Sequence, residues 1–215
     1  MRYRLLVFDW DGTIIDSAAT IVECIRQSAA EMGIEVPERS RASHVIGLGL
    51  HDSLRIAVPG LAPERYPEFV ALYRRHFLAR EDSMQLFEGM RELLGSLAKR
   101  HTLAIATGKS RRGLNRALEA SGLAARFAAS RCADETDPKP HPAMLREILD
   151  ELSVEPRHAL MIGDTSHDME MAKAAGVDAV AVTYGAHPER ALLACSPLGC
   201  LANVAALNEW LRTNA

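Results

Sequence analysis

Short apolar runs that alternate with helical patterns constrain this chain most. Runs at 103–106, 159–162 and 179–182 are separated by stretches whose apolar residues recur at helical spacing. Two more strands are predicted at residues 5–8 and 127–129. Strands that alternate with helices form βαβ units, which build a parallel sheet covered on both faces. The sequence therefore predicts a doubly wound, Rossmann-like α/β core.

The stretch 17–82 has a different pattern, with helical spacings only. One apolar stripe begins at Ile21 and another follows Pro63. We find no convincing strand between these residues. The sequence thus predicts a small all-α cap at 17–82, inserted after the first strand, with residues 1–16 and 83–215 forming the catalytic core.

Composition narrows the class of protein. A net charge of −3 and a pI near 6.2 give no reason to expect a nucleic-acid partner. No apolar run approaches the ~20 residues that span a bilayer, and the first strand does not resemble a signal peptide. The four cysteines are scattered, which suits reduced thiols and not a zinc or disulfide framework. We expect a cytoplasmic protein, either a monomer or a homodimer.

Polar residues follow the predicted strands, where an open α/β sheet binds its ligand, near the topological switch point. Because parallel strands end at the same edge, we expect these residues to meet. They are Asp9, Asp11, Gly12 and Thr13 after the first strand; Thr107, Gly108 and Lys109 after the second; Asp164 and Asp168 after 159–162; and Lys139 in an Asp-Pro-Lys-Pro loop.

Hard oxygen ligands without a His or Cys cluster indicate Mg²⁺, shared by Asp9 and Asp164. Thr107, the amides at Gly108 and the charge of Lys139 would surround a phosphoryl group. A carboxylate beside the cation can attack phosphorus to give an acyl phosphate, and a neighbouring acid can protonate the leaving oxygen. Each motif alone is a common turn or helix start, but their order at successive strand ends favours a shared site.

These motifs resemble those of the haloacid dehalogenase superfamily of phosphatases. FDWDGTIID matches the first motif, Thr107 the second, Lys139 the third and GDTSHD the fourth. The resemblance covers essentially the whole chain, including a helical cap after the first motif. Trp10 stands where the family usually has a smaller apolar residue, which should alter packing and not chemistry.

The resemblance implies a role for each motif residue. Asp9 would be the nucleophile and Asp11 the general acid and base. Mg²⁺ would be bound by Asp9, Asp164 and the backbone carbonyl of Asp11. Phosphate would be bound by Thr107, Gly108 and Lys139, with Asp168 orienting Lys139 or a metal-bound water. Gly12 would be a further substrate contact.

Branches of the superfamily require different residues, which can be compared with this sequence. Dehalogenases and phosphonatases lack the acid at Asp11, and phosphonatases need a cap lysine, which 17–82 does not contain. β-Phosphoglucomutase-like enzymes have a similar cap segment but carry an arginine where this chain has Leu50. A phosphoglycolate phosphatase-like enzyme therefore fits best, and the mutase is the alternative. A receiver-type phosphoacceptor module fits less well, because it would be about half as long and lack a cap.

Substrate specificity is expected in the cap, since the core loops address only the phosphoryl group. Gly49 and His51, in the segment 47–51, are predicted to contact the substrate, because glycines permit close backbone approach. That segment offers little aromatic surface, which favours a small polar leaving group such as a hydroxy acid or a sugar. Whether His167, Arg111 or Arg112 contacts the substrate is left open.

Overall fold

The core is a six-stranded sheet with the strand order β3-β2-β1-β4-β5-β6, in which every pairing is parallel. The computed structural model describes residues 2–215, apart from the side chain of Asp82. This order reverses direction between β1 and β4, so the switch point lies there. The predicted doubly wound fold is confirmed. The strands are β1 Leu5–Phe8, β2 Thr102–Thr107, β3 Ala129–Cys132, β4 Ala159–Gly163, β5 Asp178–Val182 and β6 Cys200–Leu201.

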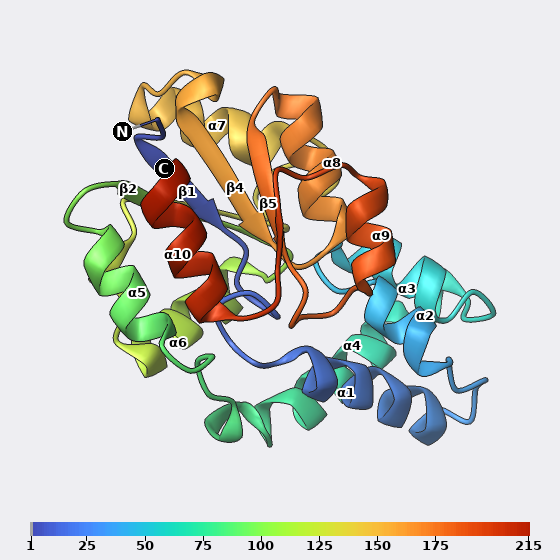
Figure 1. Ribbon diagram of the computed structural model, residues 1–215. Helices are drawn as coiled ribbons and strands as arrows, with labels where there is room; N and C mark the ends of the chain where they lie inside the picture. The colour runs from blue at the N-terminus through green and yellow to red at the C-terminus, as the bar shows by residue number, and fades with distance from the viewer. Residues whose placement is uncertain (1) are drawn as a thin grey trace.

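Helices cover both faces of the sheet (Figure 1). Alternate side chains of β1 point to opposite faces, as strand geometry requires. Leu6 and Phe8 join the apolar cluster beneath α5, α6 and α10, whereas Leu5 and Val7 join the one beneath α7 and α8. The helices of the core are α5 Met90–Leu97, α6 Arg111–Ser121, α7 Ala143–Leu152, α8 Ser166–Ala175, α9 Glu189–Ala194 and α10 Val204–Asn214.

The third strand differs from its prediction. The apolar run at 127–129 suggested the strand, but β3 spans Ala129–Cys132. Ser130 and Arg131 are half-buried on this edge strand, so they interrupt the apolar run without interrupting the pairing with β2. Apolar content alone therefore shifted the predicted bounds toward the preceding turn.

Helices α1 to α4 group beyond one end of the sheet (Figure 1). They share an apolar cluster of their own, which contains Ile25, Leu54 and Phe69. No strand occurs in the described residues between 17 and 82. A separate apolar cluster supports our division into cap and core, which we retain as a proposal. The four helices are α1 Ala18–Glu31, α2 Arg39–His44, α3 Leu50–Ala57 and α4 Tyr66–Leu78.

Short 3-10 turns join several of these elements, at Pro63–Arg65, Glu81–Ser83, Ala124–Arg126 and Pro156–His158. Among the residues that the structure describes, no helix combines the length and the apolar character that crossing a membrane requires.

Candidate active site

Asp9 stands directly after β1, at the switch point of the sheet. Its side chain is fully buried, and its Oδ1 lies 2.8 Å from Nζ of Lys139. This is an ion-pair distance, although the contact lacks the geometry of a hydrogen bond. Oδ2 has no hydrogen-bond partner among the described residues. Burial raises the pKa of Asp9 to about 7, against the opposing effect of Lys139. A further positive charge beside Oδ2 would thus stabilise the ionised form.

Lys139 is held between two acids. Its Nζ also lies 2.6 Å from Oδ1 of Asp168, and both side chains are buried. Burial alone would lower the pKa of Lys139, but Asp168 and Asp9 raise it above its usual value. Asp168 is fixed locally, because its Oδ2 accepts hydrogen bonds from the amide and the hydroxyl of Thr165 in the capping box that starts α8. The start of α8 therefore orients Lys139.

Asp164 follows β4 and faces Asp9 across the switch point. Its Oδ1 accepts a hydrogen bond from Thr13 Oγ1 at 2.8 Å, and its Oδ2 accepts one from the amide of Ala186 at 2.7 Å. Burial, then the charges of Asp9 and Asp168, raise the pKa of Asp164 well above its usual value. A Cβ on Gly12 would lie 2.2 Å from Oδ2 of Asp164, so only glycine leaves room for this carboxylate.

The buried acids outnumber the buried cation. Carboxylate oxygens of Asp9, Asp164 and Asp168 lie within 4.8 Å of one another, with Lys139 as their close positive partner. The free Oδ2 of Asp9 and the oxygen-only donor set fit a hard divalent cation such as Mg²⁺. The residues present therefore suit the cation that the sequence predicts.

Asp11 lies near the cap side of the site. Its Oδ1 accepts hydrogen bonds from Ser17 Oγ at 2.8 Å and from Nζ of Lys109 at 3.2 Å. The same ammonium group lies 4.7 Å from the ring centroid of Phe77, a residue of α4. This distance is typical of a cation–π contact. Lys109 thereby joins the predicted acid to the cap.

Thr107 and Gly108 end the second strand at the same edge of the sheet. Thr107 is the last residue of β2 and is buried, and its Oγ1 accepts a hydrogen bond from the amide of Lys109. A Cβ on Gly108 would lie 2.7 Å from the backbone of Gly47. The core and the 47–51 segment therefore approach each other backbone to backbone.

A cavity of about 320 Å³ opens from this site into the cap, a size typical of small-molecule pockets. Its floor includes Asp9, Asp11, Thr107 and Gly108. Its walls are largely apolar, and basic side chains from α4, α6 and the turn before α6 line it as well. The apolar lining includes Ile21, Ile25, Val45, Ile46, Leu48, Leu54, Phe69, Val70, Tyr73 and Phe77, and the basic lining comprises Arg74, Lys109, Arg112 and Arg116.

Three predicted substrate contacts lie outside the cavity lining. Gly12 packs against Asp164, and a Cβ on Gly49 would lie 2.7 Å from the ring of Pro138. The exposed His51 packs edge-on against Tyr66, at 5.5 Å between ring centroids. Substrate contact by these residues stays a prediction to which the cavity lends no support.

Some contributors have roles that the sequence does not predict. Lys109 and Thr13 are expected at the site, but their contacts with Asp11 and Asp164 come from the structure. Arg112 lines the cavity, whereas Arg111 is bound to Glu135 at 2.7 Å. Arg116 also lines it while pairing with Glu81. The salt bridges and cavity contacts of these three arginines of α6 distinguish them, and the sequence does not show those contacts.

A parallel α/β fold with an acid-rich, lysine-bearing site at its switch point defines the class: an enzyme with the elements for phosphoryl chemistry. Within that class, the chain belongs to the haloacid dehalogenase-like hydrolase family, whose model matches residues 6–182. The predicted family is confirmed.

Relatives with curated names extend this result. The chain is 34% identical over 185 residues to tyrosine-protein kinase PtkA of Mycobacterium tuberculosis, covering 85% of this chain but only 62% of that protein. It is 30% identical over 222 residues to the phosphoglycolate phosphatase of Rhodospirillum rubrum, covering 97% and 90% of the two chains. A haloacid dehalogenase-like hydrolase from Streptococcus pneumoniae has the same fold, with a TM-score of 0.83, 24% identity and 99% coverage of both chains.

Proposed function

We propose that this chain is a Mg²⁺-dependent phosphatase that hydrolyses small phosphomonoesters through a phosphoaspartate at Asp9. One observation carries the proposal: the buried carboxylate of Asp9 forms part of the cavity floor, with Lys139 beside one oxygen and no described residue bonded to the other. Family membership and the similarity to a phosphoglycolate phosphatase support it.

Asp9 would attack phosphorus as the bond to the ester oxygen breaks, leaving a phosphoryl group on the carboxylate. Asp11, if protonated, would give its proton to the departing oxygen and later take one from the attacking water. Lys139 and Thr107 would stabilise the charge on the phosphoryl oxygens. Asp9, Asp164 and the backbone carbonyl of Asp11 would hold Mg²⁺, which when bound adds positive charge beside those oxygens.

The organic part of the ester would occupy the cavity. We predicted a small polar leaving group, as in phosphoglycolate or a sugar phosphate, from the lack of aromatic residues at 47–51. Helix α4 adds Phe69, Tyr73 and Phe77 to the walls. We therefore propose a small phosphorylated metabolite whose carbon skeleton contacts apolar walls. An additional acidic or hydroxyl group would face Arg112.

Phosphate release from a panel of esters tests this proposal. The panel should contain phosphoglycolate, a sugar phosphate and an alkyl phosphate, each assayed with Mg²⁺ and with excess chelator. We expect sustained, Mg²⁺-dependent release that differs among the esters. Labelling of the protein with one phosphate and no further turnover would instead indicate a phosphoacceptor module, and activity indifferent to chelator would exclude the cation role.

The β-phosphoglucomutase alternative keeps the same nucleophile but transfers the phosphoryl group to a second hydroxyl. Leu50 lines the cavity at the position where those enzymes carry an arginine. Hydrolysis is therefore the better proposal. Conversion of a sugar 1-phosphate into its 6-phosphate faster than free phosphate appears would reverse that order.

A further inference from the structure

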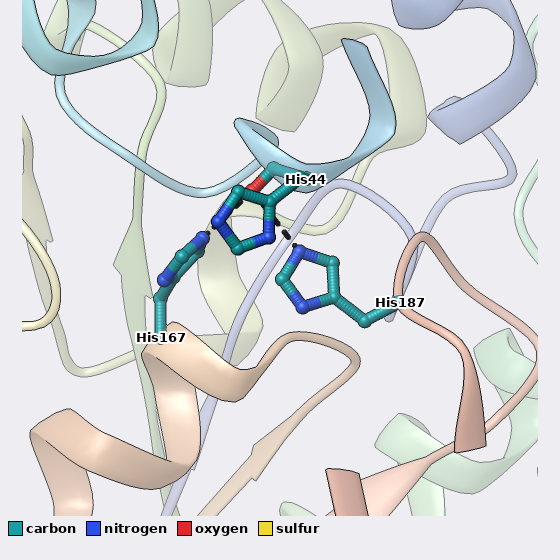
Figure 2. A group of neighbouring side chains, drawn as sticks. All are labelled: His44, His167 and His187. Carbon is teal, nitrogen blue, oxygen red and sulfur yellow. Dashed lines mark hydrogen bonds between the residues drawn. The ribbon is translucent and has the colours of Figure 1, made fainter. Parts of the chain in front are cut away.

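A histidine outside the cavity joins the cap to the core. Nδ1 of the buried His187 accepts a hydrogen bond from the amide of Ser166 at 3.1 Å, and its Nε2 lies 3.1 Å from the backbone carbonyl of His44 at the end of α2. Because an amide occupies Nδ1, the proton of the neutral ring is on Nε2 and is donated to that carbonyl. Figure 2 shows this contact. His187 thus bridges two backbone groups.

Two more hydrogen bonds hold α2 at the same point. His167 Nε2 lies 2.8 Å from the carbonyl of His44, which therefore accepts from two rings (Figure 2). Ser43 donates its hydroxyl to the carbonyl of Ala186 at 2.6 Å. Burial lowers the pKa of His167, and burial together with the proximity of His167 lowers that of His187 to about 4. Both rings are therefore neutral near pH 7.

The segment that contains Ala186 and His187 also contacts Asp164. The amide of Ala186 donates to Oδ2 of Asp164 at 2.7 Å, and the amide of His187 lies 3.3 Å from its carbonyl oxygen. A Cβ on Gly185 would lie 2.2 Å from the same carboxylate. Residues 185–187 therefore touch a proposed cation ligand on one side and the cap helix α2 on the other.

We propose that residues 185–187 couple docking of α2 to the orientation of the Asp164 carboxylate, with Ser43 and His187 as positioning residues for the cation. The inference rests on the proposed function, in which Asp164 holds Mg²⁺. Coupling is reciprocal: if a docked α2 strengthens cation binding, the bound cation must strengthen docking by the same factor. Neither residue touches the cavity, so neither would act on the substrate directly.

The imidazoles of His44, His167 and His187 could instead form a transition-metal site, since their nitrogens lie within 4.8 Å of one another. Coordination through Nε2 of His187 would need an unprotonated Nε2 and hence a proton on Nδ1. That proton would point at the amide hydrogen of Ser166, which now donates to Nδ1. The hydrogen bonds around His187 thus favour a link between backbones over a metal ligand.

Mg²⁺ binding to the full chain, measured by calorimetry, tests the coupling. Ser43→Ala removes one link from the cap side. His187→Asn keeps a short acceptor for Ser166 but does not reach His44. We expect each to weaken Mg²⁺ binding about threefold to tenfold, as loss of one hydrogen bond can. His187→Gln, whose amide nitrogen extends about as far as Nε2, should recover part of the loss.

The matched control is Ser28→Ala, which removes a serine hydroxyl that bonds within the cap, to the carbonyl of Cys24. It should leave Mg²⁺ affinity unchanged. Hydrogen exchange gives the reciprocal measurement: Mg²⁺ should slow exchange of the α2 amides more in the wild type than in His187→Asn, which keeps the Ser43 link.

The outcomes separate the two proposals. Wild-type protein that binds no Mg²⁺ overturns the proposed cation site and the coupling with it. Wild-type binding with unchanged affinity in Ser43→Ala and His187→Asn overturns the coupling alone. Stoichiometric Zn²⁺ binding in saturating Mg²⁺ that is lost in His44→Ala would also overturn the coupling. That variant keeps the backbone carbonyl of His44 and removes only the imidazole, so the loss would show that the rings bind a metal.

Discussion

At the scale of single residues, the proposed chemistry depends on the different surroundings of the two carboxylate oxygens of Asp9. Lys139 lies beside Oδ1, while Oδ2 has no hydrogen-bond partner among the described residues. An unpaired buried carboxylate oxygen is costly, and such atoms are concentrated at functional sites. In the proposed mechanism Asp9 is both the nucleophile and a cation ligand, so one substitution tests both roles.

Asp9→Asn keeps the shape of the side chain and removes its charge. Because the variant loses both the proposed attacking group and a proposed cation ligand, turnover should fall by several orders of magnitude. Steady-state phosphate release measures the loss, and circular dichroism serves as the control for folding. Retention of more than a few per cent of wild-type activity would show that another group attacks phosphorus.

Asp11→Asn separates acid catalysis from attack. A nitrophenolate leaves without needing a proton, so its phosphate ester should suffer less than an alkyl phosphate. The ratio of the two kcat/KM losses is the measurement. Equal losses would remove the acid role, leaving the contacts of Asp11 with Ser17 and Lys109 as the explanation.

The site residues that the sequence predicts at this scale are those that end a strand or directly follow one. Asp9 and Asp164 directly follow β1 and β4, and Thr107 ends β2, so strand prediction alone brings them to one edge. His187 and Phe77 are far in sequence from the residues that they contact, which include His44 for His187 and Lys109 for Phe77. Their contacts arise from packing of the cap on the core, which no local pattern encodes.

At the scale of elements, the sequence predicts the strands and helices that have a clear apolar run or a repeated apolar spacing. The four central strands and the larger helices have such patterns. Helix α2 buries only Ala42, and β6 has two half-buried residues paired with β5, so neither has a period to detect. These short elements depend on contacts with neighbouring elements, which the local sequence does not show.

The cap segment 47–51 supplies the prediction at this scale. Gly49→Val would push Pro138 away, since even a Cβ lies 2.7 Å from that ring. We expect the KM for an ester that fills the cavity to rise about tenfold, because the cap closes less well over it. Acetyl phosphate, which does not reach the cap, should change far less.

Gly60→Val is the matched control, because a Cβ on this cap glycine has no atom within 4 Å. It should leave both KM values near those of the wild type. Should Gly49→Val impair the two substrates equally, the segment acts on Lys139 through Pro138 and not on specificity. His51→Ala tests the remaining predicted contact in the same assay.

At the scale of the whole molecule, the site is a concentration of buried negative charge that folding must tolerate. Three buried carboxylates lie close together, and Lys139 pairs with two of them. The raised pKa values of Asp9 and Asp164 express that cost, and a bound cation would offset it. Cation binding, cap position and stability are therefore expected to change together.

Thermal unfolding across pH tests this connection. The pKa of Asp9 is raised from its usual range to about 7. Its neutral form therefore favours the folded state, a contribution fully present below about pH 4 and lost as pH rises through about 7. Without Mg²⁺, Asp9→Asn should unfold at a higher temperature than the wild type near pH 8, and the difference should be smaller near pH 5. Saturating Mg²⁺ should raise the wild-type Tm near pH 8, raise it little near pH 5, and leave Asp9→Asn almost unchanged. A wild-type Tm that Mg²⁺ raises equally at both pH values would show that the cation binds without needing the ionised acid, and would remove Asp9 from its ligands.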